Sequence, residues 1–333
     1  MPKFTRSLSR KLKGIVCLVI LAGGWYVKTR FNPMPEGSKV TLQFENSTAF
    51  NVAVQRLEAS GIVRDANAVK LFATLTNMKR TVQPGSYDFR PGMSITEVLR
   101  TMGKPNRRMV YVPEGRWIAR IARGLEDRRV IPAKEYIEAA SHPEKYDLQG
   151  LVPAGKTLEG LLYPDTYNFP EGTKAEFIIK RQLMNFFAKT DKLGLTKTNL
   201  KRVITIASLL ELEASDFNER KMIAGVIENR LKAGMKLQID ATINYAMQKW
   251  RPLYYKDYST VKSPYNTYLY TGLPPGPICS PTKPSIEAAL NPTKHNFVYY
   301  ITMPDGVTLF SATYPEHMKN VRKRDALKAA KTK

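Results

Sequence analysis

Apolar residues cover nearly the whole circumference of one predicted helix, from Leu200 to Leu212, and two carboxylates lie at its carboxyl end. A helix with this pattern is buried on most of its sides. Glu211 and Glu213 are two residues apart, so their side chains leave the helix on nearly opposite sides. We therefore expect the two glutamates to have separate surroundings and not to act as a close pair in one site.

Burial makes either glutamate a candidate proton donor. A carboxyl group removed from water ionises less readily, so its pKa rises toward neutral pH. A carboxylic acid tuned in this way protonates the leaving oxygen in glycosidase chemistry. The spacing does not choose between Glu211 and Glu213, and the alternative is that both cap a helix end that faces water.

A second helix follows directly. Asp216 and Glu219 have the spacing of a capping box at its beginning, and Gly234 is placed to end it. A short extended segment then leads to Asp240, which is predicted to cap the next helix, over residues 241–248.

Earlier in the chain, strands and helices alternate. The pattern predicts strands at 40–44, 86–89 and 108–115 and helices at 48–60, 66–77, 94–102, 117–127 and 133–140. This order favours an α+β fold, with a small module over residues 38–105 and a larger mixed α+β domain over residues 106–333. The end of the larger domain, residues 314–333, is predicted to be a basic helix, and we assign no chemistry to it.

Residues 1–30 predict a single membrane-spanning helix. Basic residues flank an uncharged apolar run, which is short for a hydrocarbon core of ~30 Å at a helical rise of ~1.5 Å per residue. The alternative is a cleaved signal peptide, but no small-x-small cleavage site precedes Trp25. The heavier basic flank comes first, so we expect residues 1–13 in the cytoplasm and residues 14–30 as an inner-membrane anchor. The rest of the chain then lies in the periplasm or its equivalent.

The net charge of +23, from 52 Lys and Arg against 29 Asp and Glu, favours an anionic partner. A phospholipid surface, nucleic acid and a carboxylate-bearing polymer such as peptidoglycan all fit. An exported domain has no steady access to nucleic acid, so we expect none as a partner.

The two cysteines and three histidines do not suit a disulfide framework or a metal site. Cys17 lies in the apolar run and Cys279 in a Pro-rich loop far downstream. The histidines are scattered and have no metal-ligand spacing, so we expect no metal and no cofactor.

Residues 150–157, GLVPAGKT, match the phosphate-binding pattern G-x-x-x-x-G-K-[ST]. A loop of that kind needs a buried strand before it and a sustained helix after it. The preceding residues are polar and Pro164 follows within two turns, so we predict no ATP binding here.

Tyrosine and tryptophan crowd residues 245–270. Their flat apolar faces and polar tips suit sugar rings, although they could also stack nucleobases or pack a lid. The Pro- and Gly-rich loop that follows should be rigid enough to hold Asn266 and Thr267 for hydrogen bonding. Upstream, Glu159 and Asp165 could line the same sugar cleft; the alternatives are a helix-surface charge and a turn residue.

Four ordered motifs resemble those of the endolytic murein transglycosylases of the MltG (YceG-like) family. They are EGLLYPDTY from residue 159, IASLLELE from 206, NRLKAGMKLQIDAT from 229 and SPYNTYLYTGLPPGPI from 263. The resemblance covers most of residues 80–320 and implies that the second Glu of E-x-E, Glu213, is the catalytic residue. Leu212 and Ala241 depart from the family, which more often has a basic residue and a Pro at these positions.

The resemblance implies a lytic transglycosylase without cofactor. It would cut the β-1,4 bond between MurNAc and GlcNAc within nascent strands, leave 1,6-anhydro-MurNAc ends and limit strand elongation. It also implies a LysM-like glycan-binding subdomain over residues 38–105, with peptidoglycan strands as substrate and peptidoglycan synthases as candidate partners. The expected substrate-binding residues are Glu159, Asp165, Gln238, Asp240, Tyr265, Asn266 and Tyr268.

Two other functions remain open from the residues alone. A muramidase that uses water would need a second carboxylate, for which Asp240, Asp165 and Glu159 are candidates. A non-catalytic glycan-binding scaffold would need none.

Overall fold

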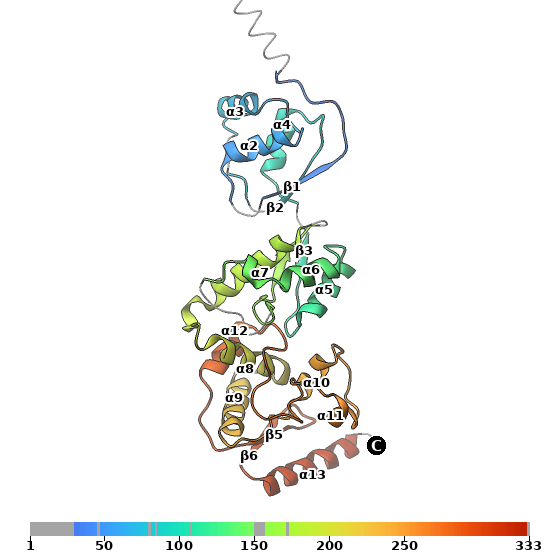
Figure 1. The fold of residues 1–333 in the computed structure, drawn as a ribbon, viewed down its shortest axis with the longest axis vertical. Coiled ribbons are helices and arrows are strands. Elements are labelled where there is room, and N and C mark those ends of the chain that lie inside the picture. Colours follow the sequence, from blue (N-terminus) through green and yellow to red (C-terminus); the bar gives the residue numbers. More distant parts are fainter. Residues whose placement is uncertain are drawn as a thin grey trace, which may run out of the picture. The chain divides into compact units, whose positions relative to one another are not determined.

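The structure, a computed structural model, describes residues 30–44, 47–78, 81–83, 85–106, 108–149, 157–170 and 173–331. The predicted anchor, apart from residue 30, and residues 150–156 of the phosphate-loop match lie outside the described residues. In the described part of the chain no helix combines the length and apolar character that crossing a membrane requires. The chain divides into two compact units, Met1–Arg108 with Asn168–Pro170 and Met109–Tyr167 with Glu171–Lys333 (Figure 1).

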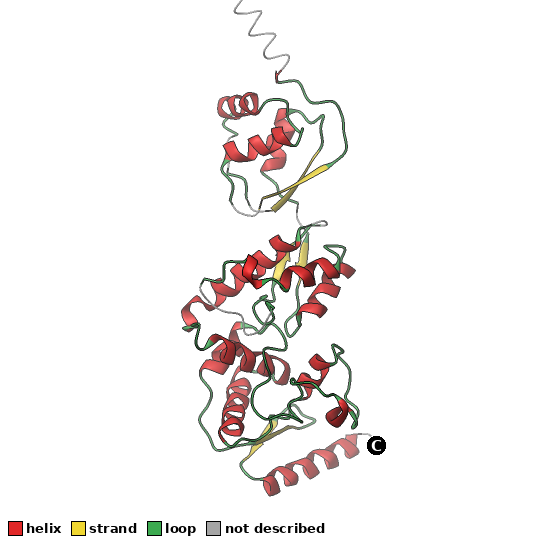
Figure 2. Cartoon of the chain, viewed as in Figure 1, coloured by secondary structure: helices red, strands yellow, loops and turns green. Residues whose placement is uncertain are grey.

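In the described residues of the first unit, three helices pack against a two-stranded antiparallel sheet (Figure 2). Its elements are β1 (Val40–Phe44), α2 (Phe50–Ala59), α3 (Ala66–Leu75), β2 (Gly85–Phe89) and α4 (Ile95–Met102). Val40 pairs with Phe89, and the core holds Phe44 and Tyr87, which are fully buried. The order of strands and helices predicted for residues 38–105 is confirmed, while a glycan-binding role for this unit stays a prediction.

The remaining helices and strands begin at residue 109. They are β3 (Met109–Tyr111), α5 (Ile118–Asp127), α6 (Ala133–Ala140), β4 (Thr166–Asn168), α7 (Ala175–Thr190), α8 (Leu200–Glu213), α9 (Phe217–Lys232), α10 (Asp240–Ala246), α11 (Asp257–Thr260), α12 (Lys283–Leu290), β5 (Tyr299–Thr302), β6 (Thr308–Ser311) and α13 (Tyr314–Lys331), with short 3-10 turns at Pro143–Lys145 and Asp191–Leu193. The strands form two small sheets, β3 with β4 and β5 with β6. The mixed α+β fold predicted from the sequence is confirmed.

Helix α8 is the buried element around which the second unit packs. It contacts α9, α10 and α12, and Ile204, Leu209 and Leu210 are fully buried. Gly160 lies close against it with φ +84°, and a Cβ there would approach Pro277 to 2.6 Å and Ile204 to 2.7 Å. The predicted burial of this helix on most of its sides is therefore confirmed, and close packing explains the glycine of the first motif.

The beginning of α9 differs from its prediction. Asp216 caps the helix by accepting a hydrogen bond from the Glu219 N–H at 2.9 Å. The Glu219 carboxylate accepts a hydrogen bond from the Thr308 hydroxyl instead of reaching back to the cap. Only half of the predicted capping box is present, because the β5–β6 hairpin supplies a competing donor. Gly234, with φ +66°, follows the end of α9 as predicted.

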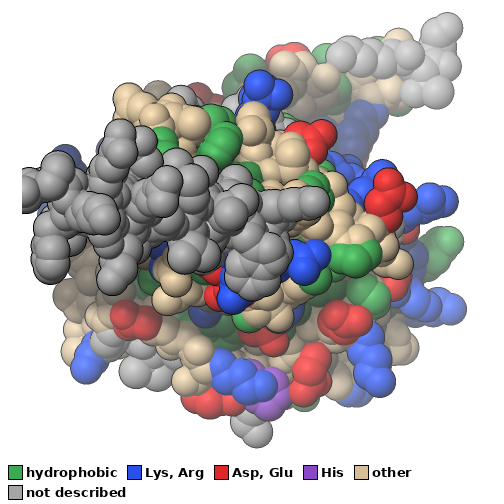
Figure 3. Space-filling view, turned by 90° about the horizontal axis from the view of Figure 1, so that it is seen from above, with side chains coloured by type: hydrophobic (Ala, Val, Ile, Leu, Met, Phe, Trp, Pro, Cys, Tyr) green, Lys and Arg blue, Asp and Glu red, His purple; other side chains and the backbone are tan. Residues whose placement is uncertain are grey.

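Charged side chains of both signs lie on the surface. On the visible part of the face in Figure 3, Lys and Arg side chains are interspersed with Asp and Glu. The positive excess of the sequence is not gathered there into one continuous patch.

Candidate active site

A pocket of about 520 Å³ receives the carboxyl group of Glu213. It is built from the end of α8, α9, the segment before α10, the first residue of α10, the tyrosine-rich segment, β5 and α13. Its lining residues are Glu213, Arg230, Gln238, Asp240, Tyr268, Tyr300, Ile301, Thr302, His317, Val321, Arg324 and Lys328. Of the predicted site residues, the fold thus brings Glu213, Gln238, Asp240 and Tyr268 together.

Glu213 is the last residue of α8 and faces β5. Its carboxylate accepts a hydrogen bond of 2.7 Å from the Tyr300 hydroxyl. Burial raises the pKa of Glu213 to about 7, and the negative charge of Asp240 acts in the same direction, while the hydrogen bond from Tyr300 opposes the rise. A carboxyl group with this pKa is present in both protonation states near neutral pH, so it can donate a proton and take one back.

Glu211 has different surroundings, as the helical spacing predicts. Its side chain is 4 % exposed and lies 3.5 Å from the Arg220 guanidinium. One carboxylate oxygen accepts hydrogen bonds from the Thr282 N–H at 2.8 Å and the Thr282 hydroxyl at 2.7 Å. Because Thr282 precedes the first residue of α12, Glu211 ties that helix to α8. The alternative in which both glutamates cap a water-facing helix end is wrong.

Asp240 does not cap α10, so that prediction is also wrong. It is the first residue of the helix, the residue before it is Ile239, and no side-chain cap is formed. Its carboxylate accepts hydrogen bonds from the Tyr268 hydroxyl at 2.6 Å and from the Tyr258 hydroxyl at 3.4 Å. Two tyrosine hydroxyls take the place of the helix N–H groups and direct the carboxylate into the pocket.

Arg230 joins the walls of this pocket. Its guanidinium donates hydrogen bonds to the Val298 carbonyl at 2.6 Å and the Leu237 carbonyl at 2.6 Å. These carbonyls lie just before β5 and just before Gln238, whose backbone has a φ of +53°. Arg230 therefore holds two segments in register and places a positive charge that lowers the pKa of Glu213.

Helix α13 contributes pocket residues that sequence reasoning missed. His317, Val321, Arg324 and Lys328 line the pocket, and the helix packs on β5 and β6 (Figure 1). The His317 ring stacks on that of Tyr299, with 5.0 Å between centroids. These four residues recur at helical spacing and therefore share one face of the predicted basic helix. The sequence could thus have indicated that this face contacts another part of the protein.

Two of the other predicted site residues belong to a separate buried cluster. Glu159 is 7 % exposed, and its carboxyl oxygens accept hydrogen bonds of 3.2 and 3.1 Å from the N–H of Ile118, the first residue of α5. The Tyr245 hydroxyl lies 3.5 Å from this carboxyl group, and the Tyr265 ring lies 4.8 Å from that of Tyr245. Neither Glu159 nor Tyr265 lines the pocket of Glu213, so their contact with substrate stays a prediction.

Asp165 and Asn266 support loops. Asp165 accepts a hydrogen bond of 2.9 Å from the Asn185 side chain, and this bond lowers its pKa. Asn266 is fully buried, donates to the carbonyls of Tyr258 and Val261, and accepts from the Tyr268 N–H. Asn266 thus shapes the loop that presents Tyr268, and neither residue lines the pocket.

The buried carboxyl of Glu159 leads to a stability prediction. Burial raises its pKa to about 8, against about 4.3 for an unfolded Glu. The protonated group therefore favours the folded state, and this contribution is complete below about pH 4.3 and is lost as the pH rises through about 8. Glu159→Gln mimics the neutral form, so the variant should melt above the wild type at pH 9, with a smaller difference at pH 6.

Thermal unfolding at both pH values measures this effect. Asp165→Asn is the matched control, because the pKa of Asp165 is lowered and its substitution should not stabilise the protein at high pH. If the melting temperatures of the wild type and of Glu159→Gln declined equally between pH 6 and pH 9, the raised pKa of Glu159 would be contradicted.

In the described part of the chain, no group of three or more His, Cys, Asp or Glu side chains is arranged to hold a metal ion.

Comparison with known proteins identifies one family profile, related enzymes and a related crystal structure. The profile of the YceG-like family matches residues 42–323. An endolytic murein transglycosylase from Bacillus subtilis (strain 168) is 31 % identical over an alignment of 326 positions, which covers 90 % of this chain and 90 % of that protein. One from Streptococcus pneumoniae is 28 % identical, over 92 % of this chain and 63 % of that protein. The crystal structure of a YceG-like protein from Listeria monocytogenes matches with a TM-score of 0.56 and 30 % identity, covering 85 % of this chain and 99 % of that chain.

Proposed function

We propose that this chain, which belongs to the YceG-like family, is a lytic transglycosylase of peptidoglycan with Glu213 as its catalytic acid and base. One observation carries the assignment of the residue: a carboxyl group with its pKa raised to about 7 opens into a pocket of about 520 Å³. The cations that line this pocket, Arg230, Arg324 and Lys328, outnumber its two carboxylates and suit a substrate that carries negative charge.

In the first step, protonated Glu213 donates its proton to the glycosidic oxygen between MurNAc and GlcNAc. The bond from that oxygen to C1 of MurNAc breaks, and positive charge develops on the sugar. Asp240 lines the same pocket, and its carboxylate, held by Tyr268, stabilises this charge. The hydrogen bond from Tyr300 stabilises the Glu213 carboxylate that the proton transfer leaves behind.

In the second step, the Glu213 carboxylate takes the proton of the C6 hydroxyl of the same MurNAc. The C6 oxygen attacks C1 and closes a 1,6-anhydro ring, which returns Glu213 to its protonated form. The C6 hydroxyl replaces water as the nucleophile, so no second carboxylate is needed to activate a water molecule. One carboxyl group of near-neutral pKa therefore serves both steps.

The product decides between this reaction and hydrolysis. Because Asp240 shares the pocket with Glu213, a muramidase with Asp240 as second carboxylate is the alternative. Peptidoglycan digested by the purified protein in water enriched in heavy oxygen should yield 1,6-anhydro-MurNAc ends without label by mass spectrometry. Label at the new MurNAc ends would instead assign the protein to the hydrolases.

We propose further that the cuts fall within glycan strands, because the relatives of this chain are named endolytic. An enzyme of this kind would limit the elongation of nascent strands, and peptidoglycan synthases would be its natural partners. Release of terminal disaccharides alone in the same digest would contradict the endolytic mode.

We propose that residues 14–30 anchor the protein in the cell membrane, with the catalytic unit outside the cytoplasm. The basic flank of the apolar run supports this orientation. A reporter that is active only outside the cytoplasm, fused after Lys333, should be active, and the fusion should resist washing with salt. A shortened, soluble form released from the membrane would favour a cleaved signal peptide.

A further inference from the structure

The hydrogen bond from Tyr300 to Glu213 depends on where the hairpin of β5 and β6 lies. The bond, of 2.7 Å, joins residues that are 87 positions apart, one on β5 and one at the end of α8. Among the described residues β5 and β6 form a two-stranded sheet, in which Tyr300 lies opposite Phe310. Such a hairpin has little stability alone, and its ladder does not fix its place relative to α8. Contacts outside the ladder must therefore hold the hairpin where Tyr300 meets the carboxylate.

Asn229, on α9, binds the lead-in segment of β5, residues 295–298. Its side-chain amide donates hydrogen bonds to the His295 carbonyl at 2.8 Å and to the Phe297 carbonyl at 2.9 Å. An amide nitrogen has two N–H groups, so both are used on this segment. Phe297 lies three residues before Tyr300. Asn229 thus helps to set the distance between α9 and the beginning of β5.

The ring of His295 braces the same segment. Its Nδ1 accepts a hydrogen bond of 3.1 Å from the Phe297 N–H, so Nε2 carries the hydrogen and donates it to the Met222 carbonyl at 2.9 Å. Met222 also belongs to α9. Because the lead-in segment is tied both to itself and to the helix, a shift at Asn229 would also move the residues that follow it in β5.

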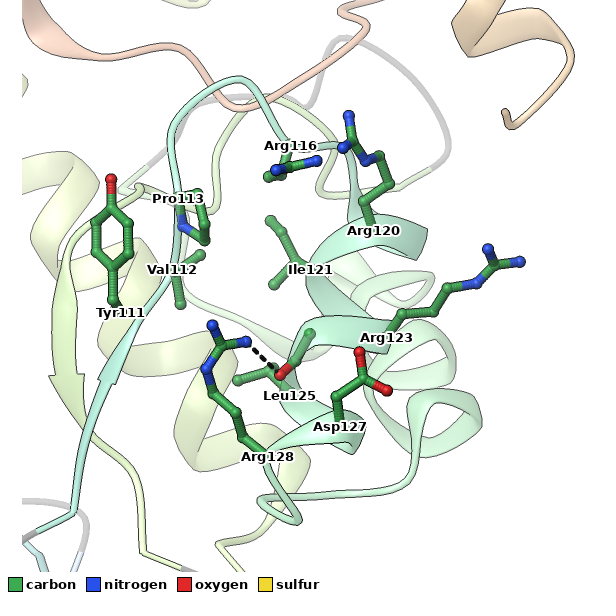
Figure 4. A pocket seen from close by; sticks show the side chains of 11 residues that line it. Tyr111, Val112, Pro113, Arg116, Arg120, Ile121, Arg123, Leu125, Asp127 and Arg128 are labelled. Carbon is green, nitrogen blue, oxygen red and sulfur yellow. Dashed lines mark hydrogen bonds between the residues drawn. The ribbon is translucent and has the colours of Figure 1, made fainter. Parts of the chain in front are cut away.

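Hydrogen bonds from a side chain to a backbone carbonyl differ in what they hold together. Arg128, directly after α5, donates to the carbonyl of Gly124, only four residues earlier (Figure 4). That bond acts within the end of one helix. The two bonds of Asn229 span 66 and 68 residues, so they fix two separate elements relative to each other. This is the kind of contact that the bond between Tyr300 and Glu213 requires.

Other residues of α9 also bind the hairpin or its lead-in segment, but they are charged. Arg230 donates to a carbonyl of the lead-in segment at 2.6 Å, and Glu219 accepts a hydrogen bond from the Thr308 hydroxyl. Burial has the largest effect on the pKa of Glu213, but Arg230 lowers this pKa and Glu219 raises it through their charges. Asn229 has no charge and does not line the pocket of Glu213. Its substitution therefore releases the hairpin without removing a charge from the site.

We propose that Asn229 is a positioning residue, which fixes the lead-in segment on α9 and so holds the Tyr300 hydroxyl against the Glu213 carboxylate. The inference rests on the proposed function, in which Glu213 is the catalytic acid and base. The Tyr300 hydroxyl stabilises the carboxylate as the proton leaves, and a displacement of about 1 Å would stretch this bond beyond hydrogen-bonding distance. Asn229 thus acts on the reaction without touching the substrate.

Carboxyl-carbon NMR of the purified full chain, labelled with ¹³C in its glutamates, measures the titration of Glu213 directly. The signal is assigned as the one missing from Glu213→Gln, and in the wild type it should titrate at about pH 7. In Asn229→Ala it should titrate about one pH unit higher, because a hydrogen bond that favours the ionised form is lost. Tyr300→Phe should give a shift of similar size. The double variant should shift no further than Tyr300→Phe alone, since both substitutions remove the same bond.

Asn185→Ala is the matched control. Asn185, on α7, also donates two hydrogen bonds from its amide, to Asp165 at 2.9 Å and to the Tyr167 hydroxyl at 3.0 Å, and it does not line the pocket. Its substitution should lower the melting temperature and leave the titration of Glu213 unchanged. If Asn229→Ala does not fold, Asn229→Ser, which keeps one donor, should give a smaller shift in the same direction.

An unchanged titration of Glu213 in a folded Asn229 variant would overturn the proposal. An equal shift in Asn185→Ala, or a double variant that shifts by the sum of the two single variants, would overturn it as well. The titration involves no glycan cleavage, so it can succeed while the product experiment fails, and the reverse. Where cleavage is measured, the fall of kcat/KM at high pH should move with the NMR titration.

Discussion

Glu213→Gln is expected to lower the rate of glycan cleavage by at least ~100-fold, the usual contribution of a general acid or base. The amide keeps the size of the side chain and can still meet the Tyr300 hydroxyl, but it can neither donate nor take the proton. The rate is measured as 1,6-anhydro ends formed on isolated peptidoglycan. Thermal unfolding of the variant should show that the fold is retained.

Glu211→Gln is the matched control because the two glutamates share a helix end and differ in surroundings. Glu211 contacts Thr282 and Arg220 and does not line the pocket, so its substitution should affect melting temperature more than turnover. If Glu211→Gln abolished cleavage while Glu213→Gln left it intact, the assignment of the catalytic acid would be wrong.

The pKa of Glu213 also predicts the pH profile of the wild type. The acid must be protonated in the free enzyme, so kcat/KM should fall about tenfold per pH unit above about pH 7. The hydrogen bond from Tyr300 lowers the pKa of Glu213, so Tyr300→Phe should move this fall to higher pH. A profile that does not shift would assign the fall to another group.

Gly225→Ala is expected to destabilise the second unit by roughly 1–3 kcal/mol or more, as overpacking of a close contact does. Gly225 lies within α9, where an added Cβ would be 2.3 Å from the Thr293 carbonyl oxygen and 2.6 Å from His295 Nε2. Backbone supplies one of these contacts, so the segment before β5 would have to move away from α9. Denaturant unfolding followed by circular dichroism measures the change.

Gly124→Ala provides the comparison within another helix. Its Cβ would meet the flexible end of the Arg128 side chain at 3.3 Å, which can move aside. Replacement of a glycine inside a helix by alanine then stabilises by roughly 0.5–1 kcal/mol. Equal effects of the two substitutions would show that the contact between α9 and residues 293–295 is looser than the geometry indicates.

The boundaries and burial of the helices could be predicted because they depend on local sequence. The apolar circumference of residues 200–212 indicated a buried helix, and Gly234 marked the end of the next one. The choice between Glu211 and Glu213 depends on Thr282 and Tyr300, which lie 71 and 87 residues away. No local pattern contains that information.

The errors have the same origin. Asp240 has the sequence position of a helix cap, but its carboxylate accepts a hydrogen bond from the Tyr268 hydroxyl, 28 residues away, instead of capping the helix. The spacing of the basic residues of α13 marks one face of the helix, but only the packing of α13 on β5 and β6 shows that this face lines the pocket. Long-range contacts between separately predicted elements assembled the pocket.

The place of α13 in this pocket has a consequence for the order in which the protein is made. Glu213, Asp240 and Tyr300 are all synthesised before Arg324 and Lys328. Until α13 has been made, the pocket has Arg230 but lacks Arg324 and Lys328, and the side that α13 forms is missing. A chain that is still emerging thus lacks a complete site, so glycan cleavage should begin only after α13 has been made and has docked on β5 and β6. Biosynthesis itself would then delay the onset of an activity that is hazardous to the wall.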